Sequence, residues 1–201
     1  MHDLGRNEDR LRGTYEFPFE FHHIDSTHPR YVMSYHWHVE CEIMRVLQGT
    51  LTVTLDEKSF TAKAGDIIFV NSGVLHSGIP HDCIYQCIVF DMNMFLKFNS
   101  VCTEYMQKIS HQELLIYHHF TEKQPDIQRA VNSLFDSFWQ KKPGYELVVF
   151  GQFYHFFGLV FGNHYYLESL RKNRRDYKRI VQLKQVVEFI EKNYTNPITL
   201  Q

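Results

Sequence analysis

The first half of the chain alternates between apolar and polar residues. Residues 51–55 alternate strictly, which is the pattern of a β-strand with one buried face. Further short runs at residues 59–62, 67–70 and 83–90 are separated by clusters of the turn-forming residues Gly, Asn and Asp. Short strands at this spacing predict a small antiparallel barrel or sandwich between residues 15 and 90.

Beyond residue 91 the apolar residues recur every three or four positions, which is the period of an α-helix. Between residues 127 and 138 they define one amphipathic helix, which Pro143-Gly144 should end. The next segment, residues 145–166, is apolar almost all round and carries two stripes. The first stripe is Leu147, Phe150, Tyr154, Phe157 and Phe161, and the second is Val149, Phe153, Phe156 and Val160.

A helix with two apolar stripes is stable in water only when both are covered. One stripe can pack on the core of its own domain, and the other is then expected to meet a second subunit. We therefore predict a homodimer whose interface is formed by Val149, Phe153, Phe156 and Val160. The alternative is a helix that is buried entirely within one chain.

Composition narrows the class of protein. Apolar residues make up 44% of the 201 positions and aromatic residues 15%, which is enough to bury a core and excludes a mostly disordered chain. No apolar run approaches the ~18 residues of a membrane span. The charged N-terminus lacks the apolar region of a secretory signal, so we expect a cytoplasmic protein without a membrane partner.

The four cysteines form no C-x-x-C pair and are expected to be reduced thiols that pack as small apolar groups.

The net charge of −2 conceals an uneven distribution. Residues 1–170 contain 13 basic and 20 acidic side chains, a balance of −7, whereas residues 171–201 contain 8 and 3, a balance of +5. The basic excess begins in residues 169–179, which we interpret as a linker. Residues 180–201 have helical spacing, and Thr199 is a candidate N-cap for a further helix just where the sequence stops. This ending predicts that the sequence is a fragment of a longer protein.

Histidine and glutamate gather in two stretches of the predicted barrel. His36, His38 and Glu42 share the same parity, so we expect their side chains on one face of a strand, or of a strand that turns and resumes in register. His76 follows in the second stretch. Imidazole and carboxylate groups that converge in a barrel suit a divalent first-row metal such as Zn, Ni, Fe or Mn. Contacts to an effector without a metal, or a purely structural polar cluster, are the alternatives.

The two stretches resemble the two motifs of the cupin family. The motifs read His36-x-His38-x3-Glu42-x6-Gly49 and Gly65-x5-Asn71-x-Gly73-x2-His76. Three positions depart from the family pattern: Arg30 replaces a leading Gly, Asn71 replaces a Pro, and Pro80 replaces a closing Asn. The resemblance implies a mainly β fold with added α-helices, in which a cupin barrel (a double-stranded β-helix, jelly-roll-like) precedes a helical dimerisation region. It also implies that the three histidines and the glutamate occupy the positions of the metal ligands in cupin enzymes.

Residues 36–77 are also similar to the sensor domain of AraC/XylS-family transcription regulators. In that family a cupin-like barrel is followed by helices that dimerise, a linker and two helix-turn-helix subdomains, and the same order is found here. The implied organisation is an arm at 1–14, an effector-binding barrel at 15–95, a helical dimerisation region at 96–168, a linker at 169–179, and the first helix and start of a truncated helix-turn-helix domain at 180–201. DNA would be bound by the part of that domain that is missing.

The family resemblance implies a small effector inside the barrel and no catalysis. Candidate effector contacts are His36, His38, Glu42, Met44, His76 and Tyr85. A sugar would suit their polar and aromatic groups. The main alternative is a metal-dependent cupin enzyme, such as a dioxygenase or isomerase, and a dimerisation module without a ligand is a third. The sequence contains no nucleophile elbow, phosphate loop or dinucleotide fingerprint, so we assign no catalytic residue.

Overall fold

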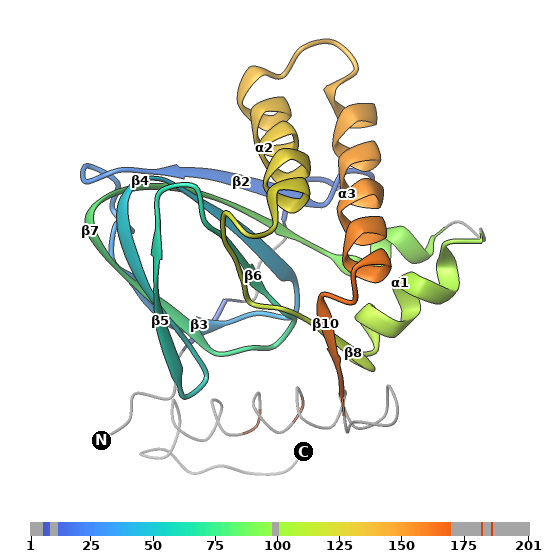
Figure 1. The fold of residues 1–201 in the computed structure, drawn as a ribbon, viewed down its shortest axis with the longest axis horizontal. Helices are drawn as coiled ribbons and strands as arrows, with labels where there is room; N and C mark the ends of the chain where they lie inside the picture. Colours follow the sequence, from blue (N-terminus) through green and yellow to red (C-terminus); the bar gives the residue numbers. More distant parts are fainter. Residues whose placement is uncertain (1–5, 9–11, 98–100, 170–181, 183–185, 187–201) are drawn as a thin grey trace, which may run out of the picture.

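Eight strands of the described residues form one strongly curled sheet, which is the body of the molecule (Figure 1). The computed structural model describes residues 6–8, 12–97, 101–169, 182 and 186. The longest strands, β4 (Cys41–Leu55) and β7 (His76–Phe90), pair antiparallel along their whole length. The other strands of this sheet are β1 (Arg6–Asn7), β2 (Phe19–Ile24), β3 (Met33–Trp37), β5 (Lys58–Lys63), β6 (Ile67–Val70) and β9 (His119–Phe120).

The two long strands bend where their pairing is irregular, close to Gly49. Register shifts lie between Val46 and Thr50, and Gly49 has a φ of +68°. A Cβ atom at this position would lie 2.2 Å from the carbonyl oxygen of Asp82, so only glycine fits the bend. The part of β4 before Gly49 pairs with β6, and the part after it pairs with β5. One long strand therefore contributes to two walls of the barrel.

The strands that the alternating pattern predicts are confirmed. Residues 51–55 lie in β4, and residues 67–70 are β6. β7 begins at His76, earlier than the predicted start at residue 83. The polar segment before residue 83 carries no alternation, but its backbone pairs with β3 and β4, and backbone pairing does not depend on apolar side chains. The curled sheet followed by helices is the predicted cupin arrangement, mainly β with α.

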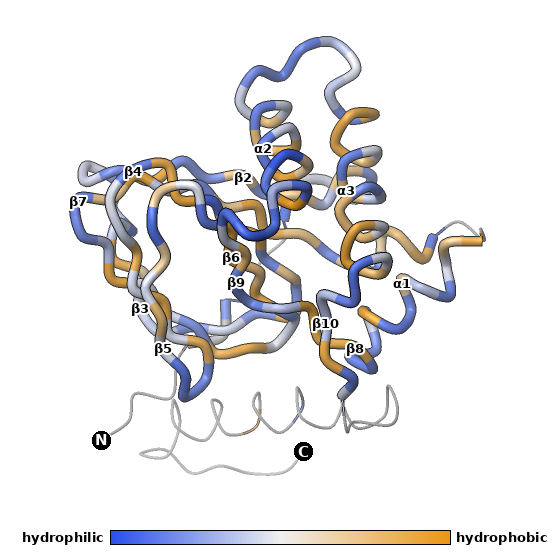
Figure 2. Tube along the Cα trace, in the orientation of Figure 1, coloured by the Kyte–Doolittle hydropathy of each residue, from blue (hydrophilic) through white to orange (hydrophobic). Residues whose placement is uncertain are grey.

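Two apolar cores lie on opposite faces of the barrel wall, because successive side chains of a strand point to opposite sides. Met44 and Tyr85 belong to the core inside the barrel. Ile43 and Ile88, their neighbours in the same two strands, belong to the second core, which the helices cover. Figure 2 shows stretches of apolar residues along the barrel strands and along α3.

The helices follow the barrel and pack against its outer face (Figure 1). The predicted helix at 127–138 is confirmed as α2 (Pro125–Gln140), and α3 (Tyr145–Gly162) follows it in a helical hairpin. The predicted apolar segment to residue 166 is not helical throughout, since it ends in a short strand. The remaining elements are η1 (Met92–Leu96), α1 (Thr103–Ser110), β8 (Leu114–Ile116) and β10 (Tyr166–Glu168), of which the last two pair with each other.

The predicted dimer interface on α3 requires a correction. Val149, Phe153, Phe156 and Val160 are each 0% exposed within a single chain, so a partner subunit cannot reach them. They pack instead on the barrel wall as part of the second core. Helical spacing identified two apolar stripes correctly, but both are apolar, and spacing alone does not determine which of them faces the chain's own sheet. The other stripe begins at Leu147, which is 80% exposed.

Part of the N-terminal arm is fixed to the barrel. β1 pairs in parallel with the end of β3, and Arg12 is 3% exposed. The predicted linker and truncated helix-turn-helix domain, from residue 170 onward, lie outside the described residues apart from two isolated positions. No helix in the described part of the chain is long and apolar enough to cross a membrane.

Candidate metal and effector site

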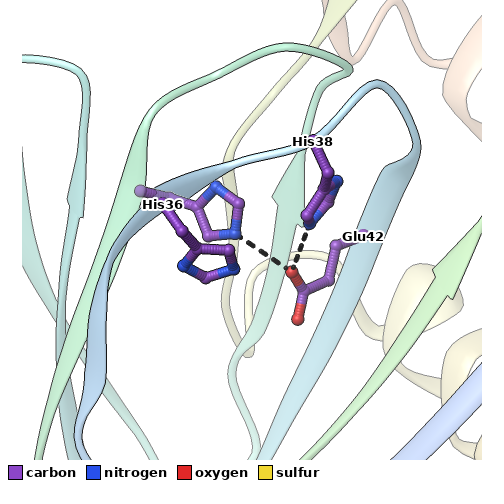
Figure 3. A group of neighbouring side chains, drawn as sticks. His36, His38 and Glu42 are labelled. Atoms are coloured by element: carbon purple, nitrogen blue, oxygen red, sulfur yellow. Dashed lines mark hydrogen bonds and ion pairs between the residues drawn. The ribbon is translucent and has the colours of Figure 1, made fainter. Parts of the chain in front are cut away.

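Three neighbouring strand ends bring the predicted His and Glu residues together (Figure 3). His36 lies in β3, His38 in the turn that follows, Glu42 in β4, and His76 at the start of β7. β3 pairs with β7 so that His36 lies opposite His76. The candidate ligand atoms of all four residues lie within 4.8 Å of one another. Of the two arrangements expected for the first stretch, the structure has the one in which the strand turns and then resumes.

Each of the three histidines is oriented by its own backbone. In each ring Nδ1 donates a hydrogen bond to the carbonyl oxygen two residues away. The pairs are His36 to Ser34 at 2.9 Å, His38 to Glu40 at 3.1 Å and His76 to Val74 at 2.9 Å. A carbonyl oxygen only accepts, so Nδ1 carries the proton. In the neutral ring Nε2 is then left with a lone pair, and a partner of this kind is what fixes the tautomer of a metal-binding histidine.

Glu42 occupies the centre of the cluster and is 3% exposed. Its Oε2 lies 3.3 Å from Nε2 of His38 and 3.2 Å from Nε2 of His76. If both rings are neutral, lone pairs face the carboxylate, and such contacts are favourable only with a cation or a proton between them. Nε2 of His76 is buried and has no hydrogen-bond partner among the described residues. The geometry therefore suits a bound cation.

The charge states of the cluster also fit metal ligands. Burial, with a smaller effect of nearby His76, lowers the pKa of His36 to about 4, so this imidazole is neutral at pH 7. Burial alone would raise the pKa of Glu42, but the hydrogen bonds and positive charge of His38 and His76, when these rings are protonated, outweigh it and hold that pKa well below its usual range. A metal cation in place of those protons would favour the ionised carboxylate in the same way. A neutral imidazole and an ionised carboxylate are the forms that bind metals.

A small cavity lies beside the cluster. It has a volume of about 50 Å³, and His36, His38 and Glu42 are among the residues that line it. Pockets that enclose drug-sized ligands measure about 300–1,000 Å³. The cavity has room for an ion and a few waters, but a sugar does not fit. Any larger effector would require movement at the mouth of the barrel.

Three of the six predicted effector contacts, Met44, His76 and Tyr85, do not line this cavity. His76 belongs to the cluster through its contact with Glu42. Met44 and Tyr85 are 0% exposed and belong to the apolar core inside the barrel. The Tyr85 hydroxyl donates to the carbonyl oxygen of Tyr31 at 3.2 Å. The prediction followed strand parity, which gives the correct face of the sheet but does not say how deep the core extends along it. For these two residues the expectation of effector contact is corrected to a role in packing.

The cavity is also lined by residues that the sequence pattern did not indicate as site residues. Glu8, Arg12 and Arg30 line it, from the N-terminal arm and from the loop before β3. A charged residue in a polar segment is exposed by default, so the sequence held no signal for a buried Arg12.

A second polar network, also unforeseen, connects the barrel to α2. Arg45 is 8% exposed and lies beside Met44 in β4, on the opposite face. Its Nε donates to Gln86 at 2.8 Å, and its terminal nitrogens donate to Asp136 at 2.8 Å and to Asn132 at 3.1 Å. These contacts connect the wall of the candidate site to the helical region.

In comparisons with known proteins, the chain matches one protein family. Residues 18–157 match the family described as AraC-like ligand binding domain. A protein of Bacillus subtilis (strain 168), the "Uncharacterized HTH-type transcriptional regulator YdeC", is 25% identical over 172 residues, which are 83% of this chain and 58% of that protein. The chain thus spans little more than half the length of this relative.

Among solved structures the likenesses are partial. Bacillus subtilis oxalate decarboxylase is 25% identical with a TM-score of 0.28, over 30% of this chain and 18% of that one. A conserved protein of unknown function from Streptococcus pyogenes is 15% identical with a TM-score of 0.32, over 36% of this chain and 62% of that one. Both likenesses are confined to about a third of this chain.

Proposed function

Because the chain belongs to the family of AraC-like ligand-binding domains, we propose that it is the effector-sensing part of a cytoplasmic transcription regulator that binds DNA. The regulator would bind a small effector in the barrel and DNA through a domain outside the described residues. The effector would act by binding one arrangement of the protein more tightly than another. The family match carries this proposal, and the enclosed polar cluster in the barrel supports it.

We further propose that His36, His38, Glu42 and His76 hold a divalent first-row metal. The observation that carries this proposal is the buried Nε2 of His76, which has no hydrogen-bond partner among the described residues and faces the Glu42 carboxylate. Three imidazoles and one carboxylate are ligands for Zn, Ni, Fe or Mn. When bound, such a metal supplies a Lewis-acidic position that can hold an oxygen atom of the effector.

The proposed regulator is a homodimer. Its interface cannot use the four corrected residues of α3, so we assign it to the outer side of the same helix. Leu147, Val148 and Tyr154 are 80%, 44% and 38% exposed there, which is unusual for apolar side chains close together on one helix. Sedimentation of the chain and of Leu147→Asp tests this assignment, because a charge at the centre of an apolar interface should convert a dimer to a monomer.

Thermal unfolding of the 201-residue chain, after treatment with a chelator and with each metal added in turn, tests the metal site. A metal that binds only the folded chain raises the Tm, by RT ln(1 + [L]/Kd) in free-energy terms, which is about 2.7 kcal/mol at a hundredfold excess over Kd. We expect at least one of Zn²⁺, Ni²⁺, Fe²⁺ and Mn²⁺ to do so. The rise should vanish in His76→Gln and persist in the matched control His155→Gln, since His155 is exposed on α3.

Two results of this experiment would count against the metal site. One is a wild-type Tm that none of the four metals changes. The other is an equal rise in His76→Gln and His155→Gln, because metal would then be binding elsewhere on the chain.

The second candidate function is a metal-dependent cupin enzyme, a dioxygenase or isomerase. The observation that favours it is the complete set of four donor atoms within 4.8 Å. The family match favours the sensor over the enzyme, because residues 18–157 match a family of ligand-binding domains. Oxygen uptake or isomer formation by the metal-loaded chain that stops in His76→Gln would establish the enzyme instead of the sensor.

A further inference from the structure

A carboxylate of the chain itself is held at the mouth of the barrel by two arginines. Oε2 of Glu8 lies 2.8 Å from a terminal nitrogen of Arg12, and Oε1 forms a short ion pair with Arg30. Each oxygen of one carboxylate thus receives its own guanidinium donor. The arrangement is a two-arginine binding site for a carboxylate, and a tethered side chain of this protein fills it.

Arg12 is the deeper of the two arginines. Its side chain is 2% exposed, and its other terminal nitrogen lies 2.6 Å from Glu20. Its Nε is buried without a hydrogen-bond partner among the described residues. A buried N–H group without an acceptor lowers the stability of the folded chain. The site can therefore accept a further acceptor atom, which the described residues do not provide.

This carboxylate site and the His-Glu cluster share one cavity. Glu8, Arg12 and Arg30 line it, and so do His36 and Glu42. An effector that contacted the cluster would therefore lie against the arginines as well.

Among the described residues, the segment that carries Glu8 has few backbone contacts with the barrel. β1 is only two residues long, and its two Cα pairs are Arg6 with His36 and Asn7 with Trp37. Glu8 adds one backbone hydrogen bond, from its N–H to the carbonyl oxygen of Trp37 at 2.9 Å. Short pairings of this kind open at low cost in free energy, so a free carboxylate can compete with Glu8.

We propose that the effector of this site is a small carboxylate, whose carboxylate group binds Arg30 and Arg12 in place of Glu8. The inference rests on the proposed function, because it takes the barrel to be the effector site. Charge argues for an anion over a neutral sugar. Removal of Glu8 leaves Arg30 without the partner it has in this structure, and only an anion restores that charge balance.

The geometry also assigns the residues that set this specificity. Arg30 binds the carboxylate at the rim, where its side chain is 58% exposed, and Arg12 binds it inside. The cavity limits the remainder of the molecule to a short chain. His36 and His38, which line the same cavity, would contact the remainder of the effector.

Isothermal titration of the 201-residue chain with sodium malonate, at constant ionic strength, tests the proposal. Arabinose serves as the neutral probe. Glu8→Gln removes the internal carboxylate at nearly constant size, and Arg30→Gln removes the rim cation. Arg129→Gln is the matched control, because Arg129 is an exposed arginine that pairs with Asp126 on α2.

We expect malonate to bind the wild-type chain and the control alike, and arabinose to bind neither. Glu8→Gln should bind malonate about tenfold more tightly, because the competing carboxylate is gone, and Arg30→Gln should bind it at least about tenfold more weakly. Arg30 is exposed, so its substitution should leave the fold intact, which circular dichroism verifies.

Three results would overturn the carboxylate proposal. If arabinose binds and malonate does not, the barrel is an effector site and the chemical class is wrong. If malonate binds equally to Arg30→Gln and Arg129→Gln, it binds the chain nonspecifically as an anion and not at the two-arginine site. If neither probe binds and no metal changes the Tm, both the carboxylate proposal and the proposed function fail.

Discussion

Replacing Phe153 by alanine tests how α3 is attached to the barrel. The Phe153 ring is 0% exposed, and its centroid lies 4.5 Å from that of Phe90 and 5.2 Å from that of Phe19. Truncation removes the burial of one ring and leaves a cavity between helix and sheet. Phe-to-Ala changes in such cores cost about 3–5 kcal/mol, a large part of the ~5–15 kcal/mol by which a domain is stable. At about 2–4 °C per kcal/mol, the Tm should fall by at least about 6 °C.

Urea unfolding at two protein concentrations provides the assay, with Gln140→Ala as the control, because Gln140 is an exposed residue at the end of the neighbouring helix α2. The control should stay within about 0.5 kcal/mol of the wild type. For Phe153→Ala the loss should be the same at both concentrations, because the lost contacts lie within one chain. A loss below about 1 kcal/mol, or one that grows on dilution together with loss of a dimer, would refute the intrachain packing of α3.

Two further predictions concern groups away from the cluster. Arg45→Met should lower the free energy of unfolding by about 1–3 kcal/mol in urea, because buried Gln86 loses its donor. No loss relative to Arg129→Met would show that the network to α2 carries no stability. In the native chain, a thiol reagent at pH 8 should modify one cysteine quickly, Cys102, and all four after unfolding. Burial raises the pKa of Cys41 to about 12 and that of Cys83 to about 11, so these thiols stay protonated and covered. Fast reaction of two or more thiols would contradict this burial.

Those parts of the fold that depend on local backbone geometry could be predicted from the sequence. The alternation at residues 51–55 and the helical period at 127–138 correspond to β4 and α2, because each element is set by its own repeat. Which side of α3 packs against the barrel could not be predicted in this way. Phe153 and Tyr154 lie in different apolar stripes, and only the shape of the barrel wall decides which one is buried.

The candidate site was predictable in its ligand set and not in its surroundings. The spacing of His36, His38 and Glu42 and the family resemblance predicted these residues together, and the structure brings His76, the first residue of β7, to the same cluster. The contact between Glu8 and Arg30 joins residues that are 22 positions apart in the sequence. The segment between them has no regular pattern of apolar and polar residues from which such a contact could be predicted. Such contacts depend on how the chain enters the barrel, which is a property of the whole fold.

The most direct measurement is X-ray diffraction from crystals of the chain grown with Zn²⁺, with anomalous data collected at the zinc absorption edge. We predict one strong anomalous peak inside the barrel, about 2.0–2.2 Å from Nε2 of His36, His38 and His76 and from a carboxylate oxygen of Glu42. Well-ordered side chains at this cluster with no anomalous peak between them would contradict a metal centre in the sensing barrel.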